Sequence, residues 1–348
     1  MIKVLIVDDS ALIRKILTDI LKLDSEISVV GTAKNGKEAL EKIEILKPDI
    51  ITLDIEMPLM DGLTTLKHII SKYDLPVIMI SSLTIEGAEL TLKALDEGAI
   101  DFLSKPTNIF SLSQNEIKNE IIEKIKAGAK SKVHIEQSVK IKSIPKPSFE
   151  NSILESKKFS NIIAIGTSTG GPRALQSLLP EIPKDINASI VIVQHMPPKF
   201  TKSLAERLNS ISNIKIKEAE DGDILLRGHG YIAPGDYHME VVKVGDSLVI
   251  KLNQEPKVMG LRPTVDRMME SVSRIKGYSK IGVILTGMGS DGTKGIIEMK
   301  KNNSYTIAQD ESTSVVFGMP KSAIATKSID KVLPLEDIGR EIINKLEV

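Results

Sequence analysis

The sequence predicts an α/β protein with two doubly wound domains joined by a linker. Strand-like apolar runs alternate with helical patterns, first near the N-terminus and again after residue 160 of the 348-residue chain, as in parallel sheets covered by helices. The strands are continuously apolar, which favours burial on both faces. Between the two series, Lys, Ser and Pro replace the apolar residues. We therefore expect domains at 1–126 and 159–348, with a flexible basic linker at 127–158 that is either a solvated tether or a docking segment.

The first series contains five strand–helix units. Each strand-like run is rich in Val, Ile and Leu, and the segments between the runs carry apolar residues at helical spacing. Five such units predict one parallel sheet with helices on both faces. The expected strands are residues 3–7, 28–32, 50–53, 77–80 and 99–103, and the expected helices are 11–23, 36–46, 62–71, 86–97 and about 114–126.

The second series is interrupted by a β-rich insertion. Turn signals at Pro234-Gly235-Asp236 and Gly245-Asp246 indicate hairpins within residues 224–251. We expect a doubly wound domain with a mostly parallel sheet and a hairpin-rich insertion. The expected strands are residues 162–166, 189–193, 281–285 and 305–308, and the expected helices are 172–179, 201–208, 265–273, 293–300 and about 335–346.

Composition argues against several classes of function. The 46 Lys and Arg residues balance 46 Asp and Glu residues, so no bulk attraction to nucleic acid or anionic membranes is expected. The chain has no cysteine, which excludes disulfides, thiolate metal sites and a cysteine nucleophile. The N-terminus reads as a strand rather than a signal peptide, and no apolar stretch reaches the roughly 20 residues that a membrane helix needs. We expect a cytoplasmic protein.

Three acids fall at the expected carboxyl ends of strands in the first domain. Asp8 and Asp9 follow the first run, and Asp54 follows the third; ligands gather at this edge of a parallel sheet. Two carboxylates about 4 Å apart repel by roughly 4 kcal/mol at an effective dielectric near 20, and a hard cation such as Mg²⁺ removes that cost. Singly these acids can be helix caps, but together they predict a metal-dependent aspartyl-phosphate site.

Residues after two further strands, and a turn beside Asp54, complete this expected site. Lys105 would neutralise a phosphoryl oxygen, and Ser81 would donate a hydrogen bond to it. The turn Glu56-Met57-Pro58 holds the backbone beside Asp54, where the carbonyl of Glu56 can complete the metal shell. The sequence therefore predicts a phosphoryl-binding shell around Asp54.

A second candidate site follows the first strand of the second domain. The segment from Gly166 to Pro172 reads GTSTGGP, which contains the G-x-S-x-G pattern of a nucleophile elbow centred on Ser168. A strand is expected before it and a helix after it, and amides at a helix start can stabilise an anion. A serine hydroxyl is a weak nucleophile and needs a base.

The base is sought among five histidines. His68 falls in an expected helix of the first domain and His134 in the linker, which disfavours both. His195 follows the strand after the serine helix, and because consecutive strands often neighbour one another, we favour it as the base; the alternative is a structural histidine. His229 reads as structural, and His238 as a candidate for shaping the cleft.

Asp291 is the candidate carboxylate that fixes the tautomer of the base. It lies in the glycine-rich segment 286–292, after an expected strand and before an expected helix. It can instead be a helix cap, and a glycine-rich turn can bind phosphate, although neither glycine cluster spells a complete phosphate loop. The order Ser…His…Asp differs from the Ser…Asp…His order of α/β-hydrolases, so we do not expect a standard member of that class.

Two sets of blocks resemble known families. VLIVDDS, LDIEMPLMDG, VIMISS and FLSKP match the response-regulator receiver domain in order, over about residues 1–125. This resemblance implies a flavodoxin-like fold, with Asp54 as phosphoacceptor, Asp8 and Asp9 as Mg²⁺ ligands, and Ser81 and Lys105 as switch residues. The blocks GTSTGGP, VQHMPPKFT, YIAPGDYHM, LRPTVD, LTGMGSDG and AQDESTSVVFGMP resemble the catalytic domain of the chemotaxis methylesterases.

The second resemblance implies roles and partners. It implies Ser168 as nucleophile, His195 as general base and Asp291 as its orienting partner, with the Met288 N–H as an oxyanion donor and Thr169 nearby. The implied activity is a phosphorylation-activated protein-glutamate methylesterase that also deamidates selected glutamines. Its substrates would be chemoreceptors, to which the protein would be peripheral, and its phosphodonor a chemotaxis histidine kinase. Mg²⁺ would bind the receiver, and the hydrolase site would need no cofactor.

Regulation and two rival classes complete the expectations. The unphosphorylated receiver should cover the Ser168 cleft, and phosphorylation of Asp54 should weaken that contact. A transcription regulator would carry a basic helix-turn-helix after the linker, where this sequence has a neutral α/β pattern. A non-catalytic adaptor is disfavoured by the intact set of Ser168, His195 and Asp291, and an activity assay distinguishes it.

Overall fold

The computed structural model describes residues 1–105, 115–131 and 158–346. The chain divides into two compact units, Met1–Val139 and Lys140–Val348. Residues 132–157, which make up most of the expected linker and include His134, lie outside the described residues.

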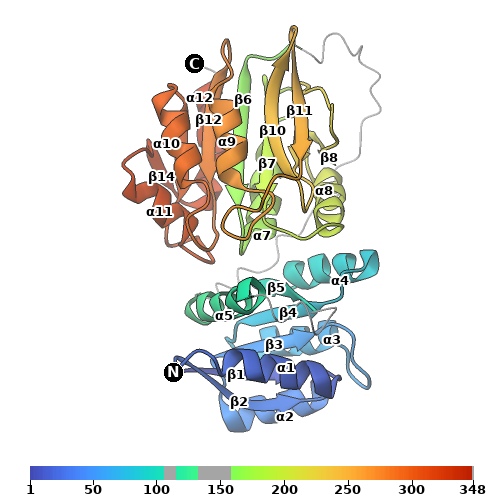
Figure 1. Cartoon of the computed structure of the whole chain (residues 1–348). Coiled ribbons are helices and arrows are strands. Elements are labelled where there is room, and N and C mark those ends of the chain that lie inside the picture. Colours follow the sequence, from blue (N-terminus) through green and yellow to red (C-terminus); the bar gives the residue numbers. More distant parts are fainter. Residues whose placement is uncertain (106–114, 132–157, 347–348) are drawn as a thin grey trace. The chain divides into compact units, whose positions relative to one another are not determined.

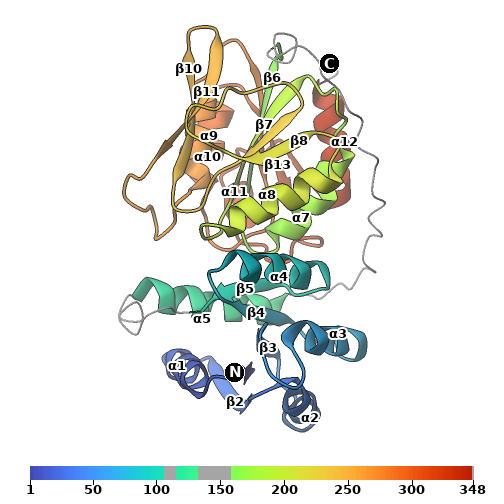
Figure 2. The same ribbon diagram turned by 90° about the vertical axis from the view of Figure 1, so that its right-hand side faces the viewer.

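The first unit is a five-stranded parallel sheet in the order β2-β1-β3-β4-β5. Helices α1 and α5 cover one face of the sheet, and α2, α3 and α4 cover the other (Figure 2). This is the doubly wound, flavodoxin-like order that the sequence predicts. The elements are β1 Ile2–Val7, α1 Ala11–Leu21, β2 Ile27–Ala33, α2 Gly36–Leu46, β3 Ile50–Asp54, α3 Gly62–Lys72, β4 Val77–Ser81, α4 Ile85–Asp96, β5 Asp101–Ser104 and α5 Asn115–Lys130.

Local sequence explains where the helices of this unit begin. Four of them start after a residue whose side-chain oxygen accepts a hydrogen bond from a backbone N–H three residues later, which satisfies an amide that the helix itself leaves unpaired. The strands other than the edge strand β2 are largely buried; Val4, Leu5, Ile6 and Val7 of β1, for example, are 0 % exposed. The capping residues are Ser10, Asn35, Asp61 and Thr84.

The second unit is a seven-stranded parallel sheet in the order β14-β13-β12-β6-β7-β9-β8, with a separate antiparallel hairpin, β10–β11. Helices α7, α8 and α12 lie on one side of the sheet, and α9 and α10 lie on the other with the hairpin (Figures 1 and 2). The strands are β6 Asn161–Thr167, β7 Ala188–Gln194, β8 Lys215–Glu218, β9 His229–Ile232, β10 His238–Val244, β11 Ser247–Asn253, β12 Ser279–Ile284, β13 Tyr305–Gln309 and β14 Lys331–Leu333. The helices are α7 Gly171–Leu178, the 3₁₀ turn η2 Leu179–Glu181, α8 Phe200–Ile211, α9 Val265–Ser273, α10 Thr293–Lys301, α11 Met319–Ala325 and α12 Leu335–Leu346.

The β-rich insertion is smaller than its turn signals suggest. Strand β9, which falls inside the expected insertion, pairs in parallel with β7 and β8 and so belongs to the main sheet. The insertion therefore contains one hairpin, which packs on α9, where Val241 N donates to Ser271 Oγ at 2.9 Å. Strands β8 and β14 and helix α11 are additional to the expected elements, and all three are short.

The chain path defines a switch point at the centre of the second sheet. The first strand, β6, lies in the middle, with β7 on one side and β12 on the other. Connections lead outward in both directions from β6, and doubly wound proteins bind ligands at the carboxyl ends of the strands at such a point, here β6 and β12. The loops after β6, β7 and β12 therefore meet at one place.

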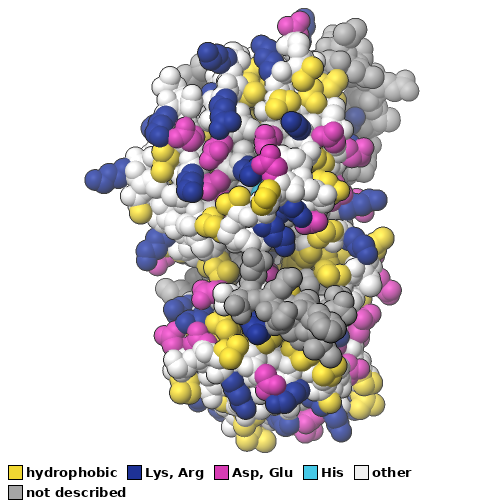
Figure 3. Space-filling model, viewed as in Figure 1, with side chains coloured by type: hydrophobic (Ala, Val, Ile, Leu, Met, Phe, Trp, Pro, Cys, Tyr) yellow, Lys and Arg dark blue, Asp and Glu magenta, His cyan; other side chains and the backbone are white. Residues whose placement is uncertain are grey.

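The surface and the helix lengths give two further facts. On the face shown in Figure 3, Lys and Arg side chains are interspersed with Asp and Glu side chains, as the balanced composition suggests. Within the described part of the chain, no helix combines the length and the apolar character that a bilayer crossing requires.

Candidate active site

Three sequence-predicted residues follow neighbouring strands of the second sheet. Ser168 follows β6, His195 follows β7, and Asp291 lies in the loop after β12. The register pairs Thr167 with Gln194, so Ser168 and His195 leave the sheet side by side. A hydrogen bond from His195 N to Thr167 O, 3.2 Å long, continues that pairing past the strand ends.

His195 and Asp291 form a buried pair. The ring Nε2 of His195 lies 2.7 Å from Oδ2 of Asp291, and the side chains are 8 % and 1 % exposed. Because Asp291 is an acceptor, the ring proton of neutral His195 lies on Nε2. Nδ1 is then the ring atom that can take a proton from a nucleophile.

Asp291 has a full set of hydrogen-bond donors. Oδ2 also accepts from Val265 N at 2.6 Å, and Oδ1 accepts from Asp266 N at 3.1 Å and Gly292 N at 3.0 Å. Burial opposes ionisation of this carboxyl, but the hydrogen bonds from His195 and from the start of α9 outweigh it and hold the pKa of Asp291 below its ordinary value. The carboxylate therefore stays ionised and fixed in orientation.

Ser168 is held through its backbone. Its N–H donates to Thr286 O at 3.1 Å, and its carbonyl accepts from Gly171 N at 2.8 Å and from Gln194 Nε2 at 2.9 Å. The hydroxyl makes no hydrogen bond to any described residue, His195 included. Catalytic hydrogen bonds are often unformed without substrate, and a rotation of a serine side chain is inexpensive.

The loop between β12 and α10 packs against Ser168. Gly287 lies so close that a Cβ atom there would be 2.9 Å from Ser168 Cβ and 2.4 Å from Met319 Sδ. Its carbonyl accepts from Gly318 N and Met319 N, which pins the loop. The next N–H, that of Met288, makes no hydrogen bond within the described chain, so it is available to an incoming anion.

Threonine side chains tie the two loops together. Thr167 Oγ1 donates to Thr286 O at 2.9 Å, and Thr286 Oγ1 donates to Thr169 O at 2.9 Å. The predicted near-site residue Thr169 is buried, at 3 % exposed. Its carbonyl thus takes part in the framework under the site.

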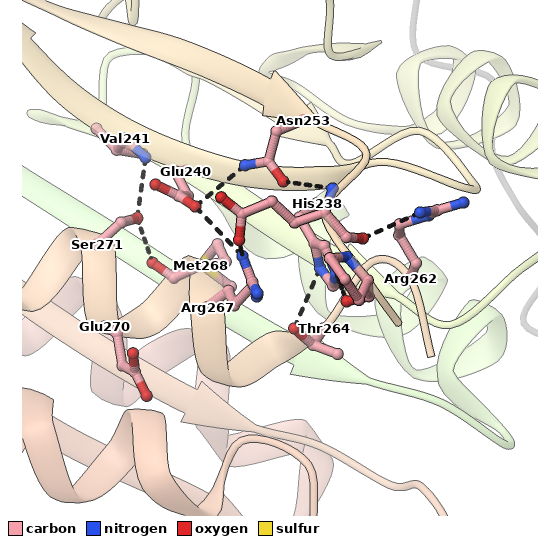
Figure 4. A network of polar contacts seen from close by, with 12 residues as sticks. His238, Glu240, Val241, Asn253, Arg262, Thr264, Arg267, Met268, Glu270 and Ser271 are labelled. Carbon is pink, nitrogen blue, oxygen red and sulfur yellow. Dashed lines mark hydrogen bonds and ion pairs between the residues drawn. The ribbon is translucent and has the colours of Figure 1, made fainter. Parts of the chain in front are cut away.

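The other histidines have structural contacts. Figure 4 shows His238 beside Thr264, at the entrance to α9; Nδ1 lies 3.3 Å from Thr264 Oγ1, and Nε2 lies 3.3 Å from Pro256 O. His238 therefore supports the segment that delivers α9 to Asp291. His229 Nδ1 donates to Arg227 O at 2.8 Å and stacks on Tyr231. His68 lies exposed on α3.

The acidic site lies in the first unit at the carboxyl ends of β1 and β3. Oxygens of Asp8, Asp9 and Asp54 all lie within 4.8 Å of one another, with Asp8 and Asp54 buried and Asp9 exposed. Burial raises the pKa of Asp54 to about 6; Lys105 opposes the rise, and the charge of Asp8 adds to it. Burial also raises the pKa of Asp8.

Lys105 and Ser81 lie at the ends of the two adjoining strands. Lys105 Nζ is 2.7 Å from Asp54 Oδ2 and 3.8 Å from Asp8 Oδ2, so it already faces the acids. Ser81 Oγ instead donates to Gly87 O of α4 at 3.0 Å and to Ser82 O at 3.4 Å. The predicted hydrogen bond from Ser81 to a phosphoryl oxygen therefore requires the hydroxyl to leave α4.

These residues fit a hard divalent cation. Asp8 Oδ2 is buried and has no hydrogen-bond donor, and three carboxylates repel one another unless a cation lies between them. Carboxylate and carbonyl oxygens are the ligands that Mg²⁺ takes. Asp8, Asp9, Asp54 and the carbonyl of Glu56 would hold it. A cavity of about 430 Å³ opens beside the acids, lined by Asp9, Ile55, Glu56, Met57, Pro58, Asp61, Leu63 and Leu90.

Some site residues were not identified from the sequence. Arg14 Nη1 donates to the carbonyls of Asp8 at 2.7 Å and Asp9 at 3.0 Å, so it fixes the acidic turn. Gln194 joins the elbow to the histidine strand, and Asp266 lies beside Asp291. Asp266 could have been noticed as an acid at a buried position on an otherwise apolar face of the expected helix. No local sequence pattern points to Arg14 or Gln194.

Comparisons with known proteins match both units. The family described as CheB methylesterase matches residues 163–342, and the response regulator receiver domain matches residues 4–130. A protein-glutamate methylesterase/protein-glutamine glutaminase of Pyrococcus horikoshii is 48% identical over 100% of this chain and 94% of its own length. The Bacillus subtilis protein of the same name is 46% identical over 98% of each chain. The crystal structure of the Thermotoga maritima CheB methylesterase catalytic domain, 45% identical, covers 54% of this chain and 98% of its own, with a TM-score of 0.52.

Proposed function

The chain belongs to the CheB methylesterase family, and we propose that it is a phosphorylation-activated protein-glutamate methylesterase and protein-glutamine glutaminase. In this proposal residues 1–126 form the receiver and 159–348 the hydrolase, joined by the linker 127–158. The observation that carries the hydrolase assignment is the buried His195–Asp291 pair, whose histidine follows the strand next to the one that leads to the half-buried Ser168.

Acylation uses the ring atom of His195 that faces away from Asp291. Nδ1 takes the proton of the Ser168 hydroxyl as Oγ attacks the ester carbonyl of a methylated glutamate. The tetrahedral intermediate places its negative oxygen near the Met288 N–H, and each donor of this kind contributes about 3–4 kcal/mol. When the intermediate collapses, the proton on Nδ1 passes to the methoxide, and methanol leaves.

Deacylation repeats the same steps with water. His195 takes a proton from water, hydroxide attacks the acyl–Ser168 ester, and the collapse returns the proton to Ser168 and releases the glutamate carboxylate. A glutamine side chain enters the same sequence and loses ammonia in place of methanol. Throughout, Asp291 remains ionised and stabilises the imidazolium, which suits its lowered pKa.

The receiver acts as the switch. Asp54 accepts the phosphoryl group, and Lys105 Nζ, which now binds Asp54 Oδ2, moves to a phosphoryl oxygen. A bound Mg²⁺ would neutralise charge between the carboxylates and the phosphoryl group. Ser81 exchanges its bond to Gly87 O for one to the phosphoryl group, which releases a tie to α4. The phosphodonor is a chemotaxis histidine kinase, and the substrates are cytoplasmic segments of chemoreceptors.

Replacing the nucleophile tests the hydrolase assignment. Ser168→Ala removes the attacking oxygen and leaves the fold intact, so methanol release from a methylated receptor should fall to the background rate. Exposed Ser177→Ala on α7 serves as the matched control and should retain full activity. Methanol release by Ser168→Ala near the wild-type rate would eliminate the assignment.

A truncation tests the regulation. A fragment that starts near Lys158 should release methanol faster than the unphosphorylated full chain, because it lacks the inhibiting unit. The solved catalytic domain that resembles residues of this chain folds without a receiver, which makes such a fragment practicable. A fragment no faster than the unphosphorylated chain would show that the receiver does not inhibit.

A further inference from the structure

Helix α9 borrows the cap at its first turn from another segment. Its N-cap residue, Thr264, makes no side-chain bond to the helix amides. Two of those amides, Val265 N and Asp266 N, donate to the carboxylate of Asp291, which precedes α10. A carboxylate at this position also satisfies the positive end of the helix dipole.

Helix α10 borrows its cap from α9 in return. Its N-cap residue is Gly292, which has no side chain, and the N–H of Gly295 in its first turn donates to Asp266 Oδ1 at 2.8 Å. Asp291 therefore caps α9, and Asp266 of α9 caps α10. The two carboxylates form a reciprocal pair of caps between the two helices.

The backbones of the two helices lie close together at this pair. A Cβ atom on Gly295 would lie 2.6 Å from Met269 Cβ and 3.2 Å from both Cα and O of Asp266. Asp266 is 6 % exposed and makes no hydrogen bond to Ser168 or His195. It therefore belongs to the helix contact and not to the group that touches the substrate.

We propose that Asp266 is a positioning residue for the hydrolase reaction: its bond to Gly295 N holds α10 against α9 and thereby fixes Asp291 on His195. The inference rests on the proposed function of Ser168, His195 and Asp291. Asp291 stands between both helices, accepting from Val265 at the start of α9 and from Gly292 at the start of α10. If α10 shifts relative to α9, these donors separate and the carboxylate turns.

Two variants with the same number of side-chain heavy atoms and the same branching at Cγ test the role of the hydrogen-bond acceptor. Asp266→Leu removes the acceptor and leaves the Gly295 amide unpaired, whereas Asp266→Asn keeps an oxygen for it. Asp266→Leu should lower kcat about 10- to 100-fold with an unchanged KM, since a small misplacement of catalytic groups has this effect. Asp266→Asn should remain close to wild type. Glu270→Leu, one turn further along α9 and 31 % exposed in its pair with Arg274, is the control and should leave kcat unchanged.

A spectroscopic readout distinguishes positioning from a general loss of structure. The proton shared by His195 Nε2 and Asp291 should give a low-field proton NMR resonance in the full chain, which Asp291→Asn identifies by its loss. This resonance should shift or broaden in Asp266→Leu and persist in Asp266→Asn. Unfolding curves establish that each variant is folded.

These measurements distinguish a failure of the proposal for Asp266 from a failure of the methylesterase assignment. A folded Asp266→Leu with wild-type kcat and an unchanged resonance overturns the proposal, as does a folded Asp266→Asn that loses kcat as far as Asp266→Leu. If Asp266→Leu does not fold, Asp266→Asn decides alone: retained kcat and resonance support the proposal, and their loss contradicts it. The resonance needs no substrate, so a failure of the methylesterase assignment shows instead as a wild-type chain that releases no methanol.

Discussion

The two sites of this chain hold buried carboxylates in opposite conditions. Asp291 in the hydrolase accepts hydrogen bonds at both oxygens, and its pKa lies below the ordinary value. Asp54 in the receiver shares a pocket with Asp8, whose Oδ2 has no donor, and its pKa is raised to about 6. Both lie at the carboxyl ends of central parallel strands, so the sheet edge alone does not decide the difference.

In the proposed function the two carboxylates have different tasks. A carboxylate that orients a base must keep one charge and one direction through every turnover, and a full set of donors provides both. A carboxylate that receives a cation and a phosphoryl group must present unmet charge; among the described residues Asp54 accepts only from Lys105 Nζ and, at 3.4 Å, from Glu56 N, and the neighbouring Asp8 Oδ2 has no donor. Asp291 accepts four hydrogen bonds from described residues and Asp54 accepts two, and the smaller number fits an acid that must take further ligands.

Asp291→Asn tests the carboxylate that has a full set of hydrogen-bond donors, and it has the largest expected effect. An amide cannot hold the imidazole in the required tautomer, so kcat should fall about 1,000- to 10,000-fold. Methanol release from methylated receptor measures the change, with exposed Asp185→Asn as control. A loss smaller than about tenfold would mean that the pair in the structure is not the catalytic pair.

Mg²⁺ binding tests the acidic site of the receiver, where Asp8 Oδ2 has no hydrogen-bond donor. A cation that binds only the folded receiver should raise its unfolding free energy by about 2.7 kcal/mol at a concentration 100 times the dissociation constant. Urea unfolding with and without MgCl₂ measures the gain. Asp8→Asn should remove most of it by removing a ligand, and exposed Asp74→Asn should not. An equal gain in wild type and Asp8→Asn would place the cation elsewhere.

Gly287→Ala perturbs the floor of the hydrolase site without touching the acid. The new Cβ would lie 2.9 Å from Ser168 Cβ, so the elbow must shift by a few tenths of an ångström. We expect kcat to fall about 10- to 100-fold with little change in the His195–Asp291 NMR resonance. Unchanged kcat would show that the loop yields instead of the serine.

The pH dependence of stability gives the smallest expected effect. Burial raises the pKa of Asp266 to about 6, so the folded chain binds this proton more tightly than the unfolded chain does. The carboxyl therefore contributes stability that is complete below its ordinary pKa near 3.8 and is lost as the pH rises through 6. From about pH 7 to pH 5, wild type should gain about 1 kcal/mol relative to Asp266→Asn. Urea unfolding at both pH values measures the change. The same difference in unfolding free energy between wild type and Asp266→Asn at pH 7 and at pH 5 would contradict this.

The sequence predicts the fold where patterns are local and continuous. Strands such as β6 and β7 are apolar at nearly every position and are readily recognised. Strand β8, with the sequence KIKE, has one buried residue in four, and β14 has three residues at the edge of the sheet, so neither forms a long apolar run. The sequence pattern assigns β9 to the insertion because its pairing with β7 joins residues far apart in the chain and leaves no local pattern.

The same limit applies to the site. The acids and the serine were found because each ends a recognisable strand. The hydrogen bond from Gly295 N to Asp266 Oδ1 joins residues 29 positions apart, and its role depends on two helices whose contact the sequence does not encode locally. The spacing of residues likewise does not predict that the Ser81 hydroxyl donates to Gly87 O.

Methanol release by the full chain, with and without a small-molecule phosphodonor and Mg²⁺, tests the central contrast most directly. Wild type should accelerate when the donor is added, Asp54→Asn should keep its basal rate whether or not donor is present, and Asp291→Asn should remain near background in both conditions. A chain in which Asp54→Asn accelerates as wild type does, or in which Asp291→Asn releases methanol at the wild-type rate, would contradict the division of roles between the two carboxylates.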